Sequence, residues 1–221
     1  MKLFVVIPAY NEEKNIDSVI KNIKSIQNCN SNIVVVDDGS SDSTFNIANQ
    51  NQVQVLRHVV NLGKGAALRT GCDYAIQKGA DVIIAVDADG QHDPNKIPEF
   101  VDEIKDNQIV FGFRTLGESM PFVLRFGNWF INKTTAVLFN IRLKDTQCGY
   151  RAFTSNAYKN IRWSASDYSM ESEMIAKTGK SQLKYTQLSI QTIYSDKYKG
   201  TTVLDGILII CKMVWWRLSL K

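Results

Sequence analysis

The feature that most constrains the fold is a regular alternation of short β-branched runs with helical patterns in the first half of the chain. The segments between the runs place apolar side chains on one face of a helix. Strands of about four to six apolar residues that alternate with helices are typical of a parallel sheet covered on both faces. We therefore predict an α/β fold with strands at 3–7, 33–36, 53–56, 82–86 and 109–111 and helices at 12–26, 43–49, 64–77 and 97–104.

The second half predicts a different mixture of elements. A long aromatic helix is expected at 121–139, a polar loop at 145–153, a helix at 169–177, and a C-terminal hairpin from strands at 183–185 and 188–194. A chain of 221 residues without a long linker forms one domain, or one domain with a small appendage. We expect a single domain over residues 1–200, followed by an apolar C-terminal segment over residues 201–221.

The C-terminal segment allows two interpretations. Charged residues interrupt it, and its uncharged run is too short to span a bilayer. It forms either an amphipathic helix at the membrane interface, with Trp215 and Trp216 at the level of the headgroups, or a helix docked on the domain.

Composition limits the partners and the compartment. The net charge of +4 is too small to indicate a nucleic-acid-binding protein, but it suits anionic small molecules or an anionic membrane face. The four cysteines lack metal-binding spacing, so a zinc site is not expected. Because the N-terminus lacks the features of a signal peptide, we predict a cytoplasmic protein with reduced thiols.

Polar motifs follow the predicted strands at their carboxyl ends, where ligands bind in open α/β sheets. In the first motif, Pro8 is expected to end its strand, Tyr10 offers a flat face for a base, and Glu12 begins the next helix. The alternative is a turn in which Asn11 caps that helix.

Two further motifs suit a nucleotide. Asp37 and Asp38 can accept hydrogen bonds from a base or a ribose, although a turn rich in Asp and Gly is the alternative. Lys64, flanked by two glycines at the start of a helix, favours an anion. Its alternative is a flexible turn with a solvated lysine.

The fourth motif predicts a cation site. If Asp87 and Asp89 belong to the end of a strand, they point to one face and repel each other unless a positive charge lies between them. Mg²⁺ or Mn²⁺ commonly joins such carboxylates to substrate phosphates, and Gln91 offers a further oxygen ligand. The alternative is a turn that ends the strand.

The chain contains neither the dinucleotide-binding nor the P-loop glycine motif. Instead, the motifs that begin at Pro8, Val36, Gly63 and Asp87 occur in an order that resembles family 2 glycosyltransferases with the Rossmann-like GT-A fold. The resemblance covers roughly residues 1–200 and is strongest to the dolichyl-phosphate or polyprenyl-phosphate mannosyl- and glucosyltransferases.

The resemblance implies roles for particular residues. The nucleotide-sugar site would comprise Pro8, Tyr10, Glu12, Asp37, Asp38, Lys64, Asp87 and Ala88. The metal ligands would be Asp87, Asp89 and Gln91. The catalytic residues would be Asp89, Arg114 and Asp145. The acceptor phosphate would be bound by Arg114, Arg125, Arg151 and Lys197.

Three details qualify these roles. Arg151 belongs to a loop signature of the family, and a structural salt bridge under the acceptor loop is the alternative to a phosphate contact. Glu173 matches a glutamate of a later helix in the family. Lys197 and Val203 stand where the family has an arginine and a lysine, which leaves the donor and acceptor preference open because Arg and Lys bind phosphate differently.

The predicted function is metal-dependent, inverting transfer of a hexose from GDP-mannose or UDP-glucose to polyprenyl or dolichyl phosphate. The protein would lie peripherally on the cytoplasmic face of the membrane and bind no nucleic acid. A lipid phosphate is largely dianionic at neutral pH and can act as its own nucleophile. A saccharide hydroxyl acceptor would instead require a base, for which Asp145 is the candidate. A nucleotide-sugar-binding subunit without catalysis is a third possibility, against which the complete set of carboxylates argues.

Overall fold

A seven-stranded sheet forms the centre of the computed structural model, which describes residues 1–27, 30–114, 122–191 and 211–217. Across the sheet the strand order is β3-β2-β1-β4-β6-β5-β7. The strands are β1 (Leu3–Ala9), β2 (Ser31–Asp37), β3 (Gln54–Arg57), β4 (Val82–Ala85), β5 (Ile109–Arg114), β6 (Arg151–Thr154) and β7 (Tyr185–Ile190). Only β6 runs antiparallel to its neighbours, so the expected mostly parallel sheet is confirmed.

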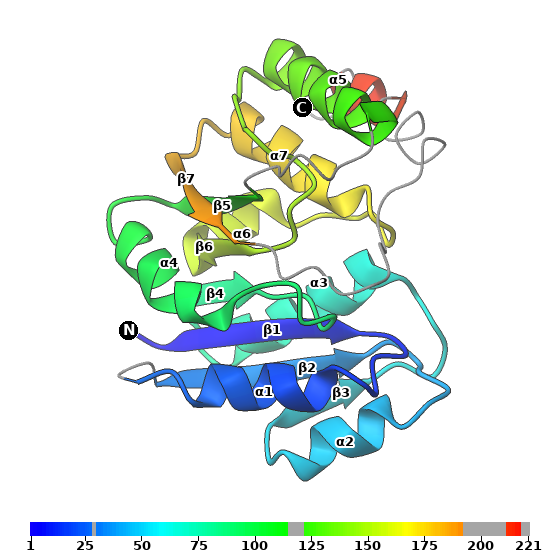
Figure 1. Ribbon diagram of the computed structural model, residues 1–221. Coiled ribbons are helices and arrows are strands. Elements are labelled where there is room, and N and C mark those ends of the chain that lie inside the picture. The colour runs from blue at the N-terminus through cyan, green and yellow to red at the C-terminus, as the bar shows by residue number, and fades with distance from the viewer. Residues whose placement is uncertain (28–29, 115–121, 192–210, 218–221) are drawn as a thin grey trace.

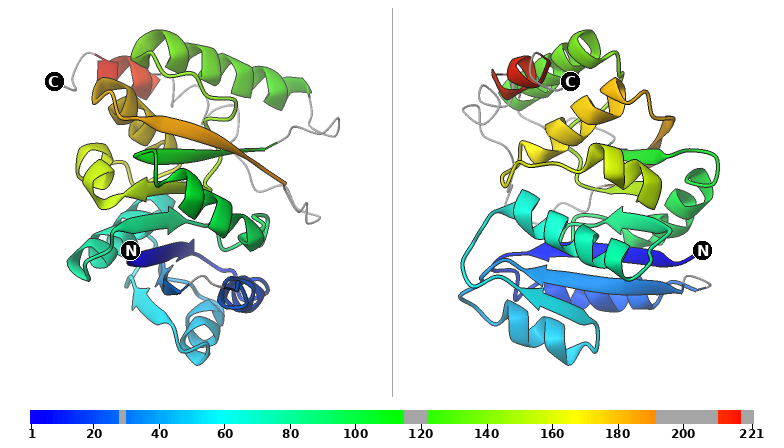
Figure 2. Two further views of the ribbon diagram at one scale, coloured as in Figure 1. Left: turned by 90° about the vertical axis from the view of Figure 1, so that its left-hand side faces the viewer. Right: turned by 180° about the vertical axis from the view of Figure 1, so that it is seen from behind.

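Helices cover both faces of this sheet, as the alternating pattern predicts (Figures 1 and 2). One face carries α1 (Ile16–Lys24), α2 (Thr44–Gln50) and α4 (Ile97–Glu103), with the short 3₁₀ helix η1 (Pro94–Lys96) before α4. The other face carries α3 (Lys64–Gln77), α6 (Ser155–Ile161) and α7 (Met170–Lys180). The long helix α5 (Phe122–Phe139) lies outside α7 at the top of Figure 1.

The two faces follow from the period of two along each strand. In β1, Phe4 and Val6 belong to the core beneath α3, whereas Val5 and Ile7 belong to the core beneath α1. All four side chains are buried. A strand with apolar residues on both faces is stable only between two layers of helices, which explains the continuous apolar runs in the sequence.

The structure corrects three sequence-based expectations. Pro8 does not end its strand: β1 continues to Ala9, and the missing N–H falls beyond Val6, where the pairing with β4 has stopped. The loop expected at 145–153 ends in a strand, β6, which enters the sheet between β4 and β5. The expected hairpin is wrong within the described residues, because 185–190 form one strand parallel to β5.

The described part of the C-terminal segment, residues 211–217, is helical and packs on the domain. Met213 and Trp216 join the core cluster of α5 and α7, as the docked-helix interpretation predicts. Trp215 keeps 67% of its surface exposed. Among the described helices, none combines the length and the apolar character that crossing a membrane requires.

Candidate active site

The predicted motifs meet at one edge of the sheet. Strands β1, β2 and β4 are parallel, so the residues that follow them lie at the same edge, and the arrows of β1 and β4 share one direction in Figure 1. The first residue of α3, Lys64, also lies at this edge, because its ammonium contacts Asp87. The structure therefore brings together the motifs that the sequence analysis placed at strand ends.

The two central acids lie beyond β4 rather than on it. Because β4 ends at Ala85, a turn at 88–89 places Asp87 and Asp89, which corrects the expectation that strand alternation aligns them. The Ala88 side chain is buried, while Asp87, Asp89 and Gln91 remain partly exposed. The Gln91 backbone N–H donates to Asp89 Oδ1 over 3.0 Å.

The two acids differ in their electrostatics. Burial raises the pKa of Asp87, but the positive charges of Lys64 and His92 outweigh it and lower that pKa to about 2. Burial and the charge of Asp87 raise the pKa of Asp89. Asp87 is thus an anion at neutral pH, and its neighbour experiences the repulsion that a bound cation would relieve.

Asp87 is held in place by its surroundings. A Cβ on Gly149 would lie 2.5 Å from Asp87 Oδ2, so a larger residue at this position would displace the carboxylate. The backbone N–H of Asp87 donates to His92 Nδ1 over 3.3 Å, and the buried His92 ring stacks on Tyr150. The sequence analysis assigned no role to His92, although it is part of the motif that follows Asp87.

Lys64 lies between two carboxylates. Its Nζ is 2.8 Å from Asp87 Oδ1 and 3.2 Å from Glu171 Oε1. Burial lowers the pKa of Lys64, but the negative charges of Asp87 and Glu171 outweigh burial. The pKa of Lys64 is therefore raised above its ordinary value, and the amine stays protonated. Glu171, in the first turn of α7, was missed by the sequence analysis, and its closeness in sequence to Glu173 was the only signal.

The acids after β2 are engaged within the protein. Asp37 is fully buried, and its Oδ2 lies 3.0 Å from Arg57 Nε. Asp38 Oδ1 lies 2.6 Å from His58 Nδ1, and its carboxylate also accepts the backbone N–H groups of residues 62 and 63. In this structure Asp38 therefore organises the loop before Lys64 rather than facing an open surface.

The first motif is divided between an exposed and a buried part. Tyr10 is 46% exposed and offers the flat face that the sequence predicts for a base. Pro8 and Glu12 are buried, and Glu12 Oε2 accepts a hydrogen bond from Asn15 Nδ2. Asn11 does not cap α1, because that helix begins only at Ile16.

Arg114 and Asp145 form a bidentate ion pair. Arg114 Nε lies 2.7 Å from Asp145 Oδ2, and Arg114 Nη2 donates to Asp145 Oδ1 over 3.2 Å. Asp145 is buried and also accepts the backbone N–H of Gln147. Its carboxylate is therefore not placed as the base that the hydroxyl-acceptor alternative requires.

Arg151 is buried beneath the site, with three backbone carbonyls as partners. Its guanidinium donates to the carbonyl oxygens of Thr146, Cys148 and Glu171 over 2.8–2.9 Å, and only 1% of the residue is exposed. This geometry argues against the predicted phosphate contact and favours the structural alternative, with backbone carbonyls in place of a salt bridge. Arg151 joins the 145–150 loop to α7.

Two predicted phosphate contacts cannot be placed. The helix α5 contains Arg125, but its side chain lies outside the described part of the structure. Lys197 also lies outside the described residues.

The residues at this edge fit a metal site whose coordination is completed by the substrate. Within the described ranges, no group of three or more His, Cys, Asp or Glu side chains is arranged to hold a metal by itself. Asp87 and Asp89 supply two partly exposed carboxylates, and burial together with the negative charge of Asp87 raises the pKa of Asp89. Hard oxygen ligands in this number suit Mg²⁺ or Mn²⁺ that completes its coordination with substrate phosphates and water.

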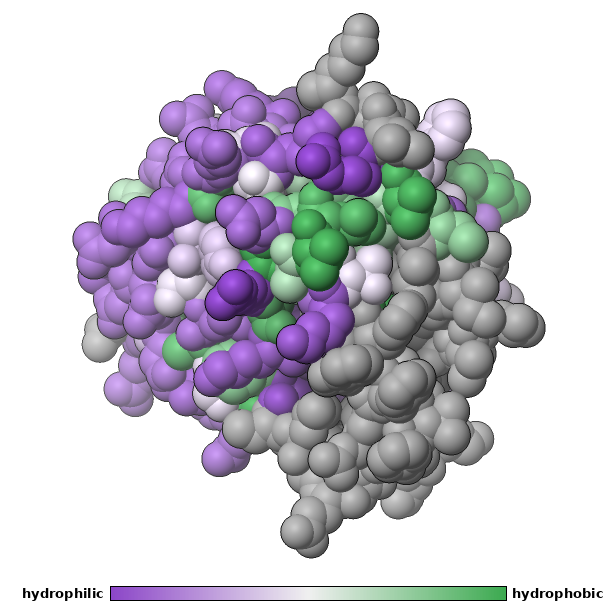
Figure 3. All heavy atoms as spheres, turned by 90° about the horizontal axis from the view of Figure 1, so that it is seen from above, coloured by the Kyte–Doolittle hydropathy of each residue, from purple (hydrophilic) through white to green (hydrophobic). Residues whose placement is uncertain are grey.

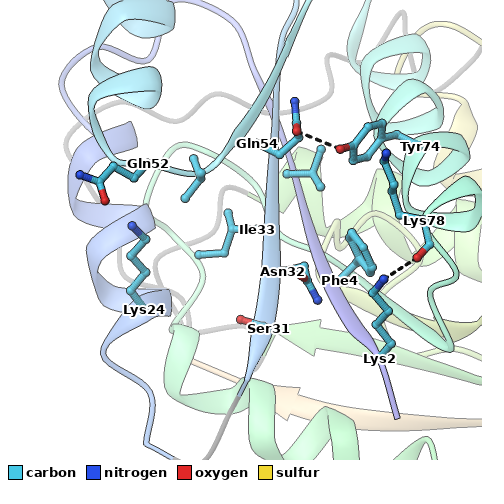
Figure 4. Close-up of a pocket in the computed structure, with 12 residues that line it drawn as sticks. Lys2, Phe4, Lys24, Ser31, Asn32, Ile33, Gln52, Gln54, Tyr74 and Lys78 are labelled. Atoms are coloured by element: carbon cyan, nitrogen blue, oxygen red, sulfur yellow. Dashed lines mark hydrogen bonds between the residues drawn. The ribbon is translucent and has the colours of Figure 1, made fainter.

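A cavity of about 410 Å³ lies at the opposite edge of the sheet (Figure 4). Lys2, Phe4 and Asn32, near the amino ends of β1 and β2, line it together with Tyr74 and Lys78 of the α3 region. It contains none of the predicted site residues. In parallel sheets the carboxyl edge is where ligands bind, so we do not assign the donor to this cavity.

Comparison with known proteins agrees with this geometry. The family model described as Glycosyl transferase family 2 matches residues 4–162. A UDP-N-acetylglucosamine–dolichyl-phosphate N-acetylglucosaminyltransferase of Methanococcus voltae is 32% identical over 98% of this chain and 96% of its own. An undecaprenyl-phosphate mannosyltransferase of Micrococcus luteus is 23% identical over 100% of this chain and 96% of its own.

A solved structure shares the fold. Glucosyl-3-phosphoglycerate synthase from Mycobacterium tuberculosis, in complex with Mn²⁺, UDP-glucose and phosphoglyceric acid, superposes with a TM-score of 0.74 and 21% identity, over 99% of this chain and 79% of that one. The expected GT-A fold is thereby confirmed. The family model covers more than half of the chain, from β1 to α6, and includes the acids after β4. The chain therefore belongs to glycosyl transferase family 2 and is a glycosyltransferase.

Proposed function

We propose that this glycosyltransferase moves a hexose from a nucleotide sugar to a polyprenyl or dolichyl phosphate with the help of a divalent cation. The observation that carries the proposal is the pair of partly exposed acids, Asp87 and Asp89, beside the ammonium of Lys64 at the carboxyl edge of the sheet. Relatives named for transfer to dolichyl and undecaprenyl phosphate support the choice of acceptor.

The chemistry requires charge stabilisation on the departing nucleoside diphosphate. A divalent cation held by Asp87 and Asp89 would neutralise part of that charge. Tyr10 provides a stacking surface for the base, and Lys64 provides a positive charge for the diphosphate. The backbone next to each is held by a hydrogen bond, from the Asn11 N–H to Ser40 Oγ and from the Gly65 N–H to the Ser166 carbonyl, which lowers the entropic cost of orienting the donor.

The acceptor is the point at which the alternatives differ. A saccharide hydroxyl needs a base, yet the carboxylate of the candidate, Asp145, is buried and paired with Arg114. A lipid phosphate needs no base, because its oxygen is already anionic at neutral pH. The ion pair therefore favours the phosphate acceptor, with Arg114 as a positively charged group beside it.

Three nucleotide sugars are candidate donors. The two relatives named above differ in the sugar that they transfer, and one of them uses a UDP-linked sugar. We therefore extend the predicted donors, GDP-mannose and UDP-glucose, by UDP-N-acetylglucosamine.

A polyprenyl-phosphate acceptor would require the enzyme to work at a membrane surface. Val137 on α5 is 82% exposed, and Val214 and Trp215 on the 211–217 helix are 47% and 67% exposed. Figure 3 shows hydrophobic residues beside hydrophilic ones on the face seen from above. An apolar surface flanked by positive side chains suits the interface of an anionic bilayer.

The test is a transfer assay with purified protein, undecaprenyl phosphate or dolichyl phosphate, Mn²⁺ or Mg²⁺, and each of the three donors. We expect a lipid-linked sugar with one donor, loss of product with EDTA, and a rate at least about 100-fold lower for Asp89→Asn. Asp102→Asn, an exposed acid on α4, is the matched control and should retain full activity. Absence of any lipid-linked product with all donors and both metals would contradict the proposal.

A further inference from the structure

The ammonium of Lys64 contacts a carboxylate oxygen of Asp87, the residue that we propose as a metal ligand. Its Nζ lies 2.8 Å from Asp87 Oδ1, within hydrogen-bonding distance. An ammonium and a divalent cation both favour this carboxylate oxygen, and two cations close together repel each other. Lys64 is thus a competitor for Asp87 from within the protein.

Glu171 holds the other side of the same ammonium. Its side chain is 3% exposed, and its Oε1 is 3.2 Å from Lys64 Nζ. Its Oε2 is buried without a hydrogen-bond partner among the described residues. A buried carboxylate that lacks partners is costly, so Glu171 depends on Lys64 for its charge compensation.

Asp87 depends on Lys64 less. His92 Nε2 lies 3.8 Å from Asp87 Oδ2, and 22% of the Asp87 side chain remains exposed to water. Of the two contacts made by the ammonium, the contact with Asp87 is therefore the one that can be exchanged at lower cost.

The backbone on both sides of the contact is held in place while the lysine side chain can move. The Asp87 backbone N–H donates to His92 Nδ1 over 3.3 Å. The backbone at the start of α3 is tied down, because the Gly65 N–H donates to the Ser166 carbonyl over 2.7 Å. Lys64 itself has a long side chain that is 20% exposed, so its ammonium can shift without a change of fold.

We propose that Lys64 and Glu171 form a counter-ion pair that sets the affinity of Asp87 for its divalent cation. The metal displaces the ammonium from Asp87, and Glu171 keeps the ammonium compensated after the exchange. Glu171 is thus a positioning residue that acts through Lys64. This inference rests on the proposed function, because it takes Asp87 as a metal ligand.

The exchange couples metal binding to nucleotide binding. Without nucleotide, the metal must compete with Lys64 for Asp87. A nucleoside diphosphate offers the displaced ammonium a second anionic partner, so it should strengthen metal binding beyond its own direct coordination. Removal of the lysine should therefore tighten binding of the metal alone and weaken the coupling.

The experiment is a titration of the full chain with Mn²⁺, with the free metal measured by electron paramagnetic resonance, without nucleotide and then with saturating UDP or GDP. Without nucleotide, we expect Lys64→Met to bind Mn²⁺ about tenfold more tightly than the wild type, equivalent to about 1.4 kcal/mol. Glu171→Gln should bind it about threefold more weakly. Lys105→Met, which removes an equal charge from an exposed ion pair, should match the wild type.

The outcomes separate this inference from the proposed function. Failure of the wild type to bind Mn²⁺ with either nucleotide, together with failure of Mg²⁺ to strengthen nucleotide binding, would overturn the proposed function itself. A wild type that binds Mn²⁺, together with a Lys64→Met variant that binds it no more tightly, would overturn the inference alone.

The double variant tests whether Glu171 acts through the lysine. In a Lys64→Met background, Glu171→Gln should have little further effect on Mn²⁺ affinity. Equal weakening in both backgrounds would mean that Glu171 acts directly on the metal and would overturn its positioning role. Thermal unfolding of each variant verifies that it is folded; if Lys64→Met does not fold, a Glu171→Gln affinity equal to or above that of the wild type overturns the inference.

Discussion

At the scale of single residues, Asp38 shows how one buried carboxylate can shape the approach to a substrate site. It contacts His58 Nδ1 and accepts the backbone N–H groups of Leu62 and Gly63. These contacts span the loop that leads into Lys64. Both oxygens are used, so the carboxylate acts on this loop as a fixed anchor.

We expect Asp38→Ala to lower the free energy of unfolding by about 1–3 kcal/mol, because two partly buried backbone N–H groups and the ring of His58 lose their acceptor. Urea unfolding measures this change, with Asp106→Ala as the control at an exposed acid. If Asp38→Ala is as stable as the control, the carboxylate does not anchor the loop. A weaker affinity for nucleotide at unchanged stability would instead favour the direct contact that the sequence predicts.

Arg151 provides the second test at this scale. Replacement by Met should lower the free energy of unfolding by roughly 2–4 kcal/mol, since three buried carbonyls lose their donors. The KM for the lipid phosphate, measured at a temperature at which the variant is folded, should stay within about twofold of the wild type. A strongly raised KM at unchanged stability would restore the predicted phosphate contact.

The residues that the sequence predicted are those near strand and helix ends. Asp87 could be predicted because it lies just after β4, and Lys64 because it is the first residue of α3. Glu171 could not be found in this way, because its role depends on contact with a lysine that is distant in sequence. Asp145 had the right chemistry for a base, but its pairing with Arg114 exists only in the folded chain.

At the scale of elements, the loop between α6 and α7 is fixed by the helix that follows it. Glu173 of α7 accepts the backbone N–H groups of Ser164 and Ala165 and pairs with Lys177 over 2.9 Å. The same loop accepts the Gly65 N–H at the start of α3. Glu173 therefore supports the position of Lys64 from a second layer of contacts.

This support should depend on pH. Burial raises the pKa of Glu173, but the hydrogen bond from Lys177 and the two backbone N–H groups lower it below the ordinary value of 4.5. A lowered pKa in the folded state means stability that is present above the unfolded pKa and lost as the pH falls through the folded pKa. We expect Glu173→Gln to be less stable than the wild type at pH 7, and the difference to shrink below about pH 4.5.

Urea unfolding at pH 7, 5, 4 and 3.5 measures this difference. The matched control is Glu103→Gln, an exposed glutamate on α4, for which the difference from the wild type should stay near zero throughout. A stability gap for Glu173→Gln that is constant across the series would contradict a role for the ionised carboxylate.

Strand β6 marks the limit of element prediction. Its four residues, Arg151–Thr154, follow a polar loop and include a charged side chain, so their pattern resembles the loop. The strand forms because its neighbours β4 and β5 provide open edges on either side. By contrast, α3 was predicted with its observed bounds because Gly63 and a continuous apolar face define it locally.

At the scale of the whole molecule, the candidate active site lies at one edge of the sheet, between the two layers of helices. A separate face carries exposed apolar side chains. Val137 and Val214 belong to α5 and the 211–217 helix, which pack together through Thr135 and Met213. Exposed Lys133 and Arg217 lie on the same two helices. This combination suits the surface of an anionic bilayer, where a polyprenyl phosphate would present its headgroup.

We expect the double variant Val137→Ser/Val214→Ser to partition about tenfold more weakly onto vesicles that contain phosphatidylglycerol, because two apolar side chains no longer enter the interface. Co-sedimentation measures the bound fraction, and Val59→Ser, at a fully exposed valine of the 58–63 loop, is the control that should bind as the wild type does. Raised salt should weaken binding of the wild type, since part of the attraction is between basic side chains and lipid phosphates. Equal binding of the double variant and the control would mean that another face approaches the membrane, and the lipid phosphate would then have to reach Arg114 from that side.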